Sequence, residues 1–148
     1  GKGIQEEDYA LLGKGLDMAE KIFAEYGLEA SYHPHLGSMA EATEQIDKLF
    51  SKTSIKICPD LAHLAAGGGN PLDIIKKYYD RISFVHLKDL DDNGFAPLGT
   101  GRLDIDGVLD FLKQKKYDGD YLVEVDGYAG DSLYACRTSY EFLKGRIF

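Results

Sequence analysis

Histidine, lysine and carboxylate side chains follow three apolar runs of this chain, where buried strands would end. His86 and Lys88 close the run FVHLKD, Asp60 and His63 follow the apolar residues at 55–58, and Glu124 lies within YLVEV. Carboxylate oxygens and imidazole nitrogens form a mixed site that suits Mn, Co, Mg or Zn, unlike a thiolate structural zinc site. The pattern predicts a pocket able to bind a divalent cation.

Helical and strand-like segments alternate along the chain. Apolar residues recur every three or four positions through residues 8–26, which predicts an amphipathic helix whose inner face includes Phe23 and Tyr26. Ser38 and Glu41 have the spacing of a capping box for a second helix. Further helices are expected from Asn70-Pro71, around 108–112 and around 133–143, and strands at 28–32, 55–58, 83–87 and 121–125.

Strands that are separated by helices cannot pair as hairpins. Their order therefore predicts right-handed crossovers and a parallel sheet covered by helices, an α/β fold of about four βα units. Active sites of such folds lie beyond the carboxyl ends of the strands, where His33, Asp60, His86 and Glu124 all fall. One such residue alone is more often structural, but four in consecutive units favour a shared pocket.

Composition limits the classes of partner. The 148 residues, 44% of them hydrophobic, suffice for one domain, so we expect a single domain over residues 1–148. The net charge of -8 disfavours nucleic acid as a partner. No apolar run reaches membrane-spanning length and no secretory signal begins the sequence. Cys58 and Cys136 form no disulfide framework, so a reducing, cytoplasmic location is expected.

Three other features have ordinary interpretations. Gly67-Gly68-Gly69 lacks the Lys-Ser/Thr ending of a phosphate loop and is expected to be a loop before a helix. Asp91 and Asp92 precede Asn93-Gly94 and are expected to be solvated turn residues. Lys88 has two open interpretations, a hydrogen bond to substrate oxygens or a pair with Asp89.

Several motifs together resemble one known family. The runs YHPHLGS, CPDLAHLAAGGGNP, FVHLKD, PLGTGRLDIDGVLDFL and YLVEVDGY are similar to the C-terminal half of a xylose-isomerase-like TIM barrel, in the branch of inosose dehydratases. The resemblance implies half of a (β/α)8 barrel, a divalent metal, and a keto or aldo sugar or inositol-derived ketone as substrate. Isomerisation, epimerisation and dehydration all remain open.

The resemblance also implies roles for individual residues. Asp60, His86 and Glu124 match metal ligands of the family, and Glu124 is also a candidate acid or base. His63, three residues after Asp60, matches a substrate-facing group. His33 stands where many members have a glutamate, which favours the inosose-dehydratase branch and puts a two-glutamate proton relay in doubt; we assign it to the metal and to substrate binding.

The expected chemistry is proton abstraction beside a polarised carbonyl. Dehydration then needs a general acid, for which His63, His35 and Lys88 are candidates. The same three side chains are expected to bind substrate, together with His33 and, from the loop at Gly99-Thr100-Gly101, Arg102; a structural salt bridge of Arg102 is an equal alternative.

Chain length raises a question of assembly. A complete TIM barrel takes about 250 residues, and the four βα units expected here make only half of one. A half-barrel on its own would expose two sheet edges and apolar surface. We therefore expect the chain to form a homodimer or to associate with a chain that supplies the N-terminal half. Alternatively, the chain is a fragment of a larger enzyme. The alternative function is a catalytically inactive half-barrel that binds sugar or serves in assembly. A nuclease of the same superfamily fits poorly, because its site needs more ligands.

Overall fold

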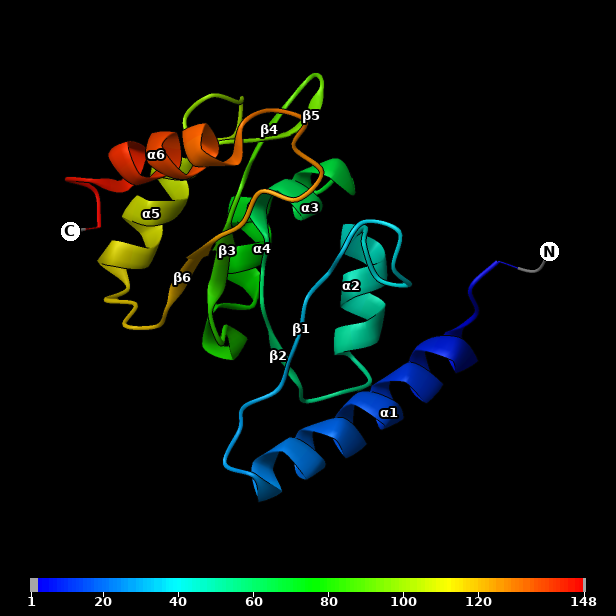
Figure 1. Cartoon of the computed structure of the whole chain (residues 1–148). Helices are drawn as coiled ribbons and strands as arrows, with labels where there is room; N and C mark the ends of the chain where they lie inside the picture. The colour runs from blue at the N-terminus through cyan, green and yellow to red at the C-terminus, as the bar shows by residue number, and fades with distance from the viewer. Residues whose placement is uncertain (1–2, 148) are drawn as a thin grey trace.

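Four parallel strands form the centre of the protein. The computed structural model describes residues 3–147. Strand β1 (Ser31–Tyr32) pairs with β2 (Lys56–Ile57), and β3 (Val85–Leu87) pairs with β6 (Tyr121–Val123). Two single parallel bridges, Ile57 to Ile82 and Asp60 to His86, join the two pairs. The spatial order β1-β2-β3-β6 follows the sequence, and the α/β expectation is confirmed (Figure 1).

The helices lie close to where the apolar periodicity predicts them. They are α1 (Glu6–Glu25), α2 (Thr43–Phe50), α3 (Leu61–Ala66), α4 (Pro71–Lys77), α5 (Ile105–Gln114) and α6 (Ser132–Leu143), with a 3-10 turn at Tyr79–Arg81. Asn70 caps α4 by accepting from the backbone N–H groups of Leu72 and Asp73, as expected for Asn before Pro. None of the helices among residues 3–147 is long and apolar enough to cross a membrane.

Two expectations about local structure are wrong, and one helix was not predicted. Helix α2 begins at Thr43 and not at Ser38, because the groups of the expected capping box have other partners: the Glu41 side chain accepts from Gly37 N–H, and Glu41 N–H donates to Gln45 Oε1. Phe23 and Tyr26 of the first helix are exposed. Residues 61–66, for which the sequence predicted no element, form helix α3.

A hairpin replaces part of the loop expected after β3. Strand β4 (Asp89–Asp91) pairs antiparallel with β5 (Gly94–Ala96). Asp92 lies in the turn as expected, but Asp91 is the last residue of β4. Gly94 has φ of +125°, a conformation that other residues rarely adopt, which explains a glycine at the end of this turn.

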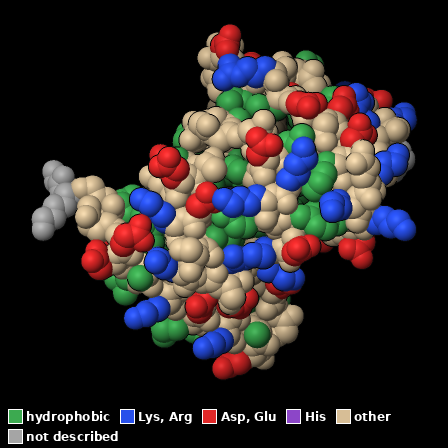
Figure 2. Space-filling view, turned by 180° about the vertical axis from the view of Figure 1, so that it is seen from behind, with side chains coloured by type: hydrophobic (Ala, Val, Ile, Leu, Met, Phe, Trp, Pro, Cys, Tyr) green, Lys and Arg blue, Asp and Glu red, His purple; other side chains and the backbone are tan. Residues whose placement is uncertain are grey.

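Two apolar clusters hold the helices against the sheet. One joins β3 to α5 and includes Val85, Leu87 and Leu112; the other joins β2 to α1 and α2 and includes Ile57, Ile46 and Leu49. On the face seen in Figure 2, acidic and basic side chains of the described residues are intermixed and no large patch of one sign forms. The segment after β6 returns across the carboxyl ends of the strands, beside α3 and the hairpin (Figure 1).

Candidate functional site

Asp60 anchors the site between a strand and a helix. It follows β2 and caps α3, where its Oδ1 accepts from the backbone N–H groups of Ala62 (2.9 Å) and His63 (3.0 Å). The side chain is fully buried, and its Oδ2 accepts no well-formed hydrogen bond. A buried carboxylate oxygen of this kind is costly unless a cation faces it.

Lys88 lies fully buried in the middle of the acidic groups. Its Nζ is 3.1 Å from Asp60 Oδ2, 2.9 Å from Glu124 Oε2 and in direct contact with Asp126. The ammonium also lies 4.8 Å from the centre of the Phe95 ring, on the hairpin. Lys88 therefore pairs with three carboxylates, none of which is Asp89.

Asp89 has a structural role instead. Its Oδ2 accepts from the N–H groups of Gly99 (3.1 Å) and Gly101 (2.9 Å), and its Oδ1 accepts from Leu90 (2.8 Å) and Leu103 (3.1 Å). These bonds fold the 99–103 loop beside the hairpin. The pair between Lys88 and Asp89 is thus a wrong alternative, because Asp89 is saturated by backbone donors.

His86 and Glu124 extend the cluster from the next two strands. His86 Nδ1 is 3.2 Å from Glu124 Oε2 and 3.6 Å from Asp60 Oδ2. His86 is buried, whereas the Glu124 side chain is 40% exposed. Glu124 can therefore meet both the buried groups and a molecule that arrives from solvent.

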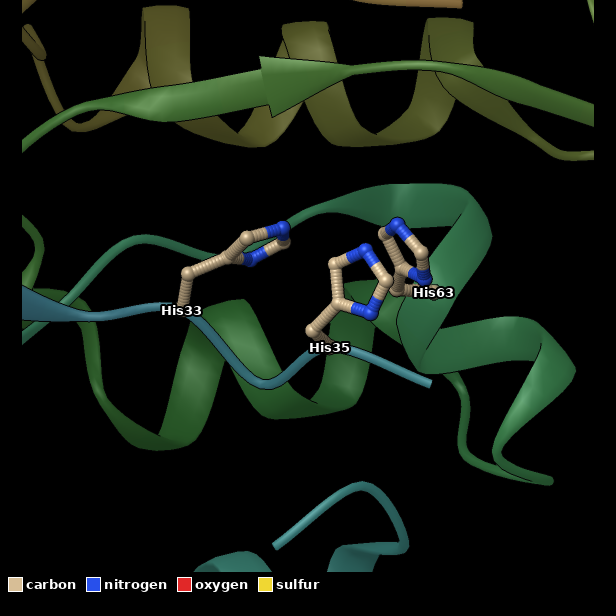
Figure 3. A group of neighbouring side chains, drawn as sticks. All are labelled: His33, His35 and His63. Carbon is tan, nitrogen blue, oxygen red and sulfur yellow. The ribbon is translucent and has the colours of Figure 1, made fainter. Parts of the chain in front are cut away.

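Three histidines line the other side of the cluster. Figure 3 shows the rings of His35 and His63 close together, with His33 beside them; the centroids of His35 and His63 are 3.8 Å apart. The His33 ring lies 4.9 Å from that of His86. His35 is exposed, and its Nε2 lies 3.8 Å from Asp126 Oδ2.

Hydrogen bonds determine which ring nitrogens carry protons. His33 Nδ1 lies 3.3 Å from Cys58 O, so it donates and leaves the buried Nε2 as a free acceptor without a partner. His63 Nδ1 accepts from Leu36 N–H at 3.2 Å, so a neutral His63 carries its proton on Nε2. His33 is thus set to bind a cation and His63 to donate a hydrogen bond.

The electrostatics of the site follow from burial and from these pairs. Burial lowers the pKa of His33, and it lowers the pKa of His63 to about 4, so both rings are neutral near pH 7. Burial raises the pKa of Glu124 and Asp60, but contacts with Lys88, His86 and, for Asp60, the cap N–H of His63 outweigh it and leave both lowered. Burial lowers the pKa of Lys88, but its contacts with the carboxylates have the larger effect and leave the pKa raised.

The donor atoms are close enough to share one cation. Ligand atoms of His33, Asp60, His63 and Glu124 all lie within 4.8 Å of one another. His86 Nδ1 lies beside the two carboxylates of that set. Two members of the set have buried atoms without a hydrogen bond among the described residues, His33 at Nε2 and Asp60 at Oδ2, and the latter faces the Lys88 ammonium. The residues present therefore fit a divalent cation with mixed oxygen and nitrogen ligands.

Arg102 is the one predicted site residue that the structure places apart from this group. Its guanidinium pairs with the exposed Asp92 at 2.5 Å, across the hairpin. The surface salt bridge, which the sequence left open, is thus present, and substrate binding by Arg102 stays a prediction.

Asp126 is a site residue that the sequence reasoning missed. It contacts Lys88, and its Oδ2 lies 3.7 Å from His63 Nε2. A signal was present, because Asp126 comes two residues after Glu124 and alternate residues of an extended segment face the same side. Phe95 was missed too, since no hairpin was expected there.

Comparison with known proteins agrees with this architecture. Residues 1–145 match the family described as xylose isomerase-like TIM barrel. The inosose dehydratase of Clostridium botulinum (strain Alaska E43 / Type E3) is 32% identical over 145 residues, which cover 83% of this chain and 49% of that protein. The inosose dehydratase of Bacillus thuringiensis (strain Al Hakam) is 32% identical over 143 residues, covering 82% and 48%. The chain spans about half the length of these relatives.

Solved structures share the fold at lower identity. An L-ribulose 3-epimerase superposes with a TM-score of 0.81 at 15% identity, covering 99% of this chain and 56% of that one. The IolI protein with a bound zinc atom superposes with a TM-score of 0.77 at 19% identity, covering 99% and 59%. At these identities the likeness shows the fold alone.

Proposed function

Because this chain belongs to the xylose isomerase-like TIM barrel family, we propose that it isomerises, epimerises or dehydrates a keto or aldo sugar or an inositol-derived ketone at a site that holds a divalent cation. The relatives named inosose dehydratase support an inositol-derived ketone within that class. The observation that carries the proposal is that His33, whose buried Nε2 has no hydrogen-bond partner among the described residues, lies in one cluster of possible ligands with Asp60, whose buried Oδ2 faces the Lys88 ammonium.

The proposed ligands are Asp60, Glu124, His33 and His86. The backbone cap fixes one oxygen of Asp60 and turns the other toward the cluster. The bond from His33 Nδ1 to Cys58 O orients that ring in the way typical of metal-binding histidines. A cation held there would polarise a substrate carbonyl and make the adjacent C–H more acidic.

The remaining residues have roles in proton transfer and substrate binding. Glu124 is the proposed base, because it is the most exposed carboxylate of the ligand set and its lowered pKa keeps it ionised. His63 offers its Nε2–H to a substrate oxygen. His35, which is exposed, is the better placed candidate to protonate a leaving hydroxyl. Lys88 is a poor proton donor, because its neighbours raise its pKa.

Calorimetry with MnCl₂ and CoCl₂ at neutral pH tests the cation site. We expect the unmodified chain to bind one cation, and Asp60→Asn or His33→Ala to weaken binding by about 10–100-fold. Asp110→Asn, at an exposed position of α5, is the control and should bind as the unmodified chain does. No measurable binding by the unmodified chain would contradict the proposal. Assays with keto-inositols and ketoses then test turnover.

An assembly role is the second candidate, supported by the flanks of the sheet. Leu122 and Val123 of β6 are exposed, and a groove of about 470 Å³ runs between β6 and α6. We propose that the half-barrel is one domain. We also propose that it associates with a second copy, or with an N-terminal half-barrel, through the exposed residues of β6 and this groove. Light scattering that gave a compact monomer, without binding of an apolar dye, would contradict this proposal.

A further inference from the structure

Lys88 contacts the same carboxylate oxygens that the proposed cation would use. We propose that Lys88 is a built-in counter-ion, which holds the carboxylates of Asp60, Glu124 and Asp126 together and shifts onto Asp126 when a divalent cation binds. The inference rests on the cation site proposed above. It assigns to Lys88 a positioning role, in place of contact with the substrate.

The first support is that the oxygens are shared. Nζ of Lys88 lies 2.9 Å from Glu124 Oε2 and 3.1 Å from Asp60 Oδ2, and both residues are proposed ligands. An ammonium and a divalent cation that contact the same two oxygens repel each other strongly in a buried site. Binding of the cation therefore requires Lys88 to leave at least part of this position.

The second support is a local excess of negative charge. Asp60, Glu124 and Asp126 carry three negative charges, and Lys88 is the positive charge that contacts all three. The excess beyond the lysine equals the charge of one divalent cation, so ammonium and cation together leave the cluster close to neutral.

The third support is that Asp126 offers a place for the ammonium. Asp126 contacts Lys88, is 41% exposed, and stands outside the group of ligand atoms that lie within 4.8 Å of one another. The Phe95 ring, whose centre lies 4.8 Å from Nζ, adds a cation–π contact with the ammonium. His63 Nε2–H faces Nζ at 3.2 Å, a contact between two donors that favours movement away from it.

Lys88 has no access to substrate in this arrangement. Its side chain is fully buried beneath Glu124 and Asp126, whose side chains are about 40% exposed. A substrate oxygen would meet those carboxylates before it met the ammonium. The burial of Lys88 therefore favours a counter-ion role over the hydrogen bond to substrate oxygens that the sequence left open.

Removal of the ammonium tests the inference directly. Lys88→Met keeps an unbranched side chain, shorter by the terminal nitrogen, and removes the charge. We expect it to bind Mn²⁺ at least about 10-fold more tightly in calorimetry, because no competing cation remains. Its Tm in EDTA should fall, and saturating Mn²⁺ should raise that Tm more than it does for the unmodified chain. Lys77→Met, which breaks an exposed pair with Asp47, is the control and should leave Mn²⁺ affinity unchanged.

Asp126→Asn provides a second test, whose first measurement uses the single variant and does not depend on Lys88→Met folding. It removes the proposed acceptor for the displaced ammonium, so Mn²⁺ affinity should fall by about 10-fold. The same substitution combined with Lys88→Met should have no such effect. Equal weakening in both backgrounds would make Asp126 a ligand and overturn the inference, as would unchanged affinity in both.

The two proposals fail in different ways. Mn²⁺ binding by the unmodified chain and Lys88→Met with equal affinity overturns the role of Lys88 and leaves the cation site intact. No Mn²⁺ binding by any of these proteins overturns the proposed function, and the shift of Lys88 with it.

Discussion

The centre of the sheet and its two flanks have opposite relations to solvent. At the centre, Asp60 and Lys88 are charged and fully buried. On the flanks, Tyr26 at the end of α1 is 77% exposed and Leu122 on β6 is 48% exposed. Charged groups are rarely buried unless paired, and the central ones are paired with one another. The charges at the ends of β2 and β3 are thus paired within this chain, whereas the flanks expose apolar side chains.

The two cysteines offer the largest expected contrast between centre and flank. Burial raises the pKa of the Cys58 thiol from 9.0 to about 12, which alone lowers its thiolate fraction about 1000-fold. Cys136, on α6, is exposed. A thiol reagent at pH 8 should therefore label Cys136 first and Cys58 only on unfolding, as mass spectrometry would show. Rapid labelling of Cys58 in the Cys136→Ser variant would refute the burial of the central cluster.

Two helix-capping aspartates allow the same substitution, Asp to Ala, to be compared between the centre and a flank. Asp60 and Asp131 both cap helices, but Asp60 also faces Lys88 in the core, whereas Asp131 is exposed. Asp60→Ala should cost about 3–5 kcal/mol of unfolding free energy, because it leaves a buried ammonium less compensated. Asp131→Ala should cost about 1 kcal/mol, the usual value of a cap. Urea unfolding in EDTA measures both, and equal losses would contradict the distinction.

Two leucines test the apolar packing in the same way. Leu87 of β3 is fully buried, and Leu122 of β6 is half exposed. Leu87→Ala should cost about 2–4 kcal/mol, because a cavity remains. Leu122→Ala should change the unfolding free energy by less than about 0.5 kcal/mol in dilute protein. A large loss for Leu122→Ala that grows with protein concentration would instead reveal an associated β6 edge.

The polar contacts of Asp47, which join α2 to the end of α4, give the smallest expected effect. Asp47 accepts from Tyr78 (2.5 Å) and pairs with Lys77 (2.7 Å). Burial raises the pKa of Asp47, but these bonds outweigh it and lower the pKa below its unfolded value. The stabilisation is therefore present above the unfolded pKa, about 3.9, and is lost as pH falls through the folded value.

Tyr78→Phe should accordingly cost about 1 kcal/mol at pH 7 and less at pH 3. Denaturant unfolding at the two pH values measures the difference. Lys144→Met, at an exposed pair with Glu141, is the control and should change little at either pH. A cost for Tyr78→Phe that grew on acidification would contradict the assigned sign.

Apolar periodicity and strand-end chemistry predicted much of this protein. The parallel order of strands and the helix starting at Pro71 follow from local patterns. The residues predicted to meet, Asp60, His86 and Glu124, lie within a few ångströms of one another. Parallel strands explain this success, because their carboxyl ends share one edge of the sheet. The hairpin at 89–96 escaped prediction, because its strands are short and continue directly from β3.

The sequence by itself determined which residue types stand at the strand ends, and therefore that an acidic and imidazole-rich pocket would form there. The pairing of Lys88 with three carboxylates of this pocket, and the presence of Asp126 among them, became clear only from the tertiary structure. The fold also determines which ring nitrogen of His33 and of His63 carries the proton. The physical reason is that strand periodicity fixes the side from which a residue projects, whereas its partners depend on segments far away in the chain.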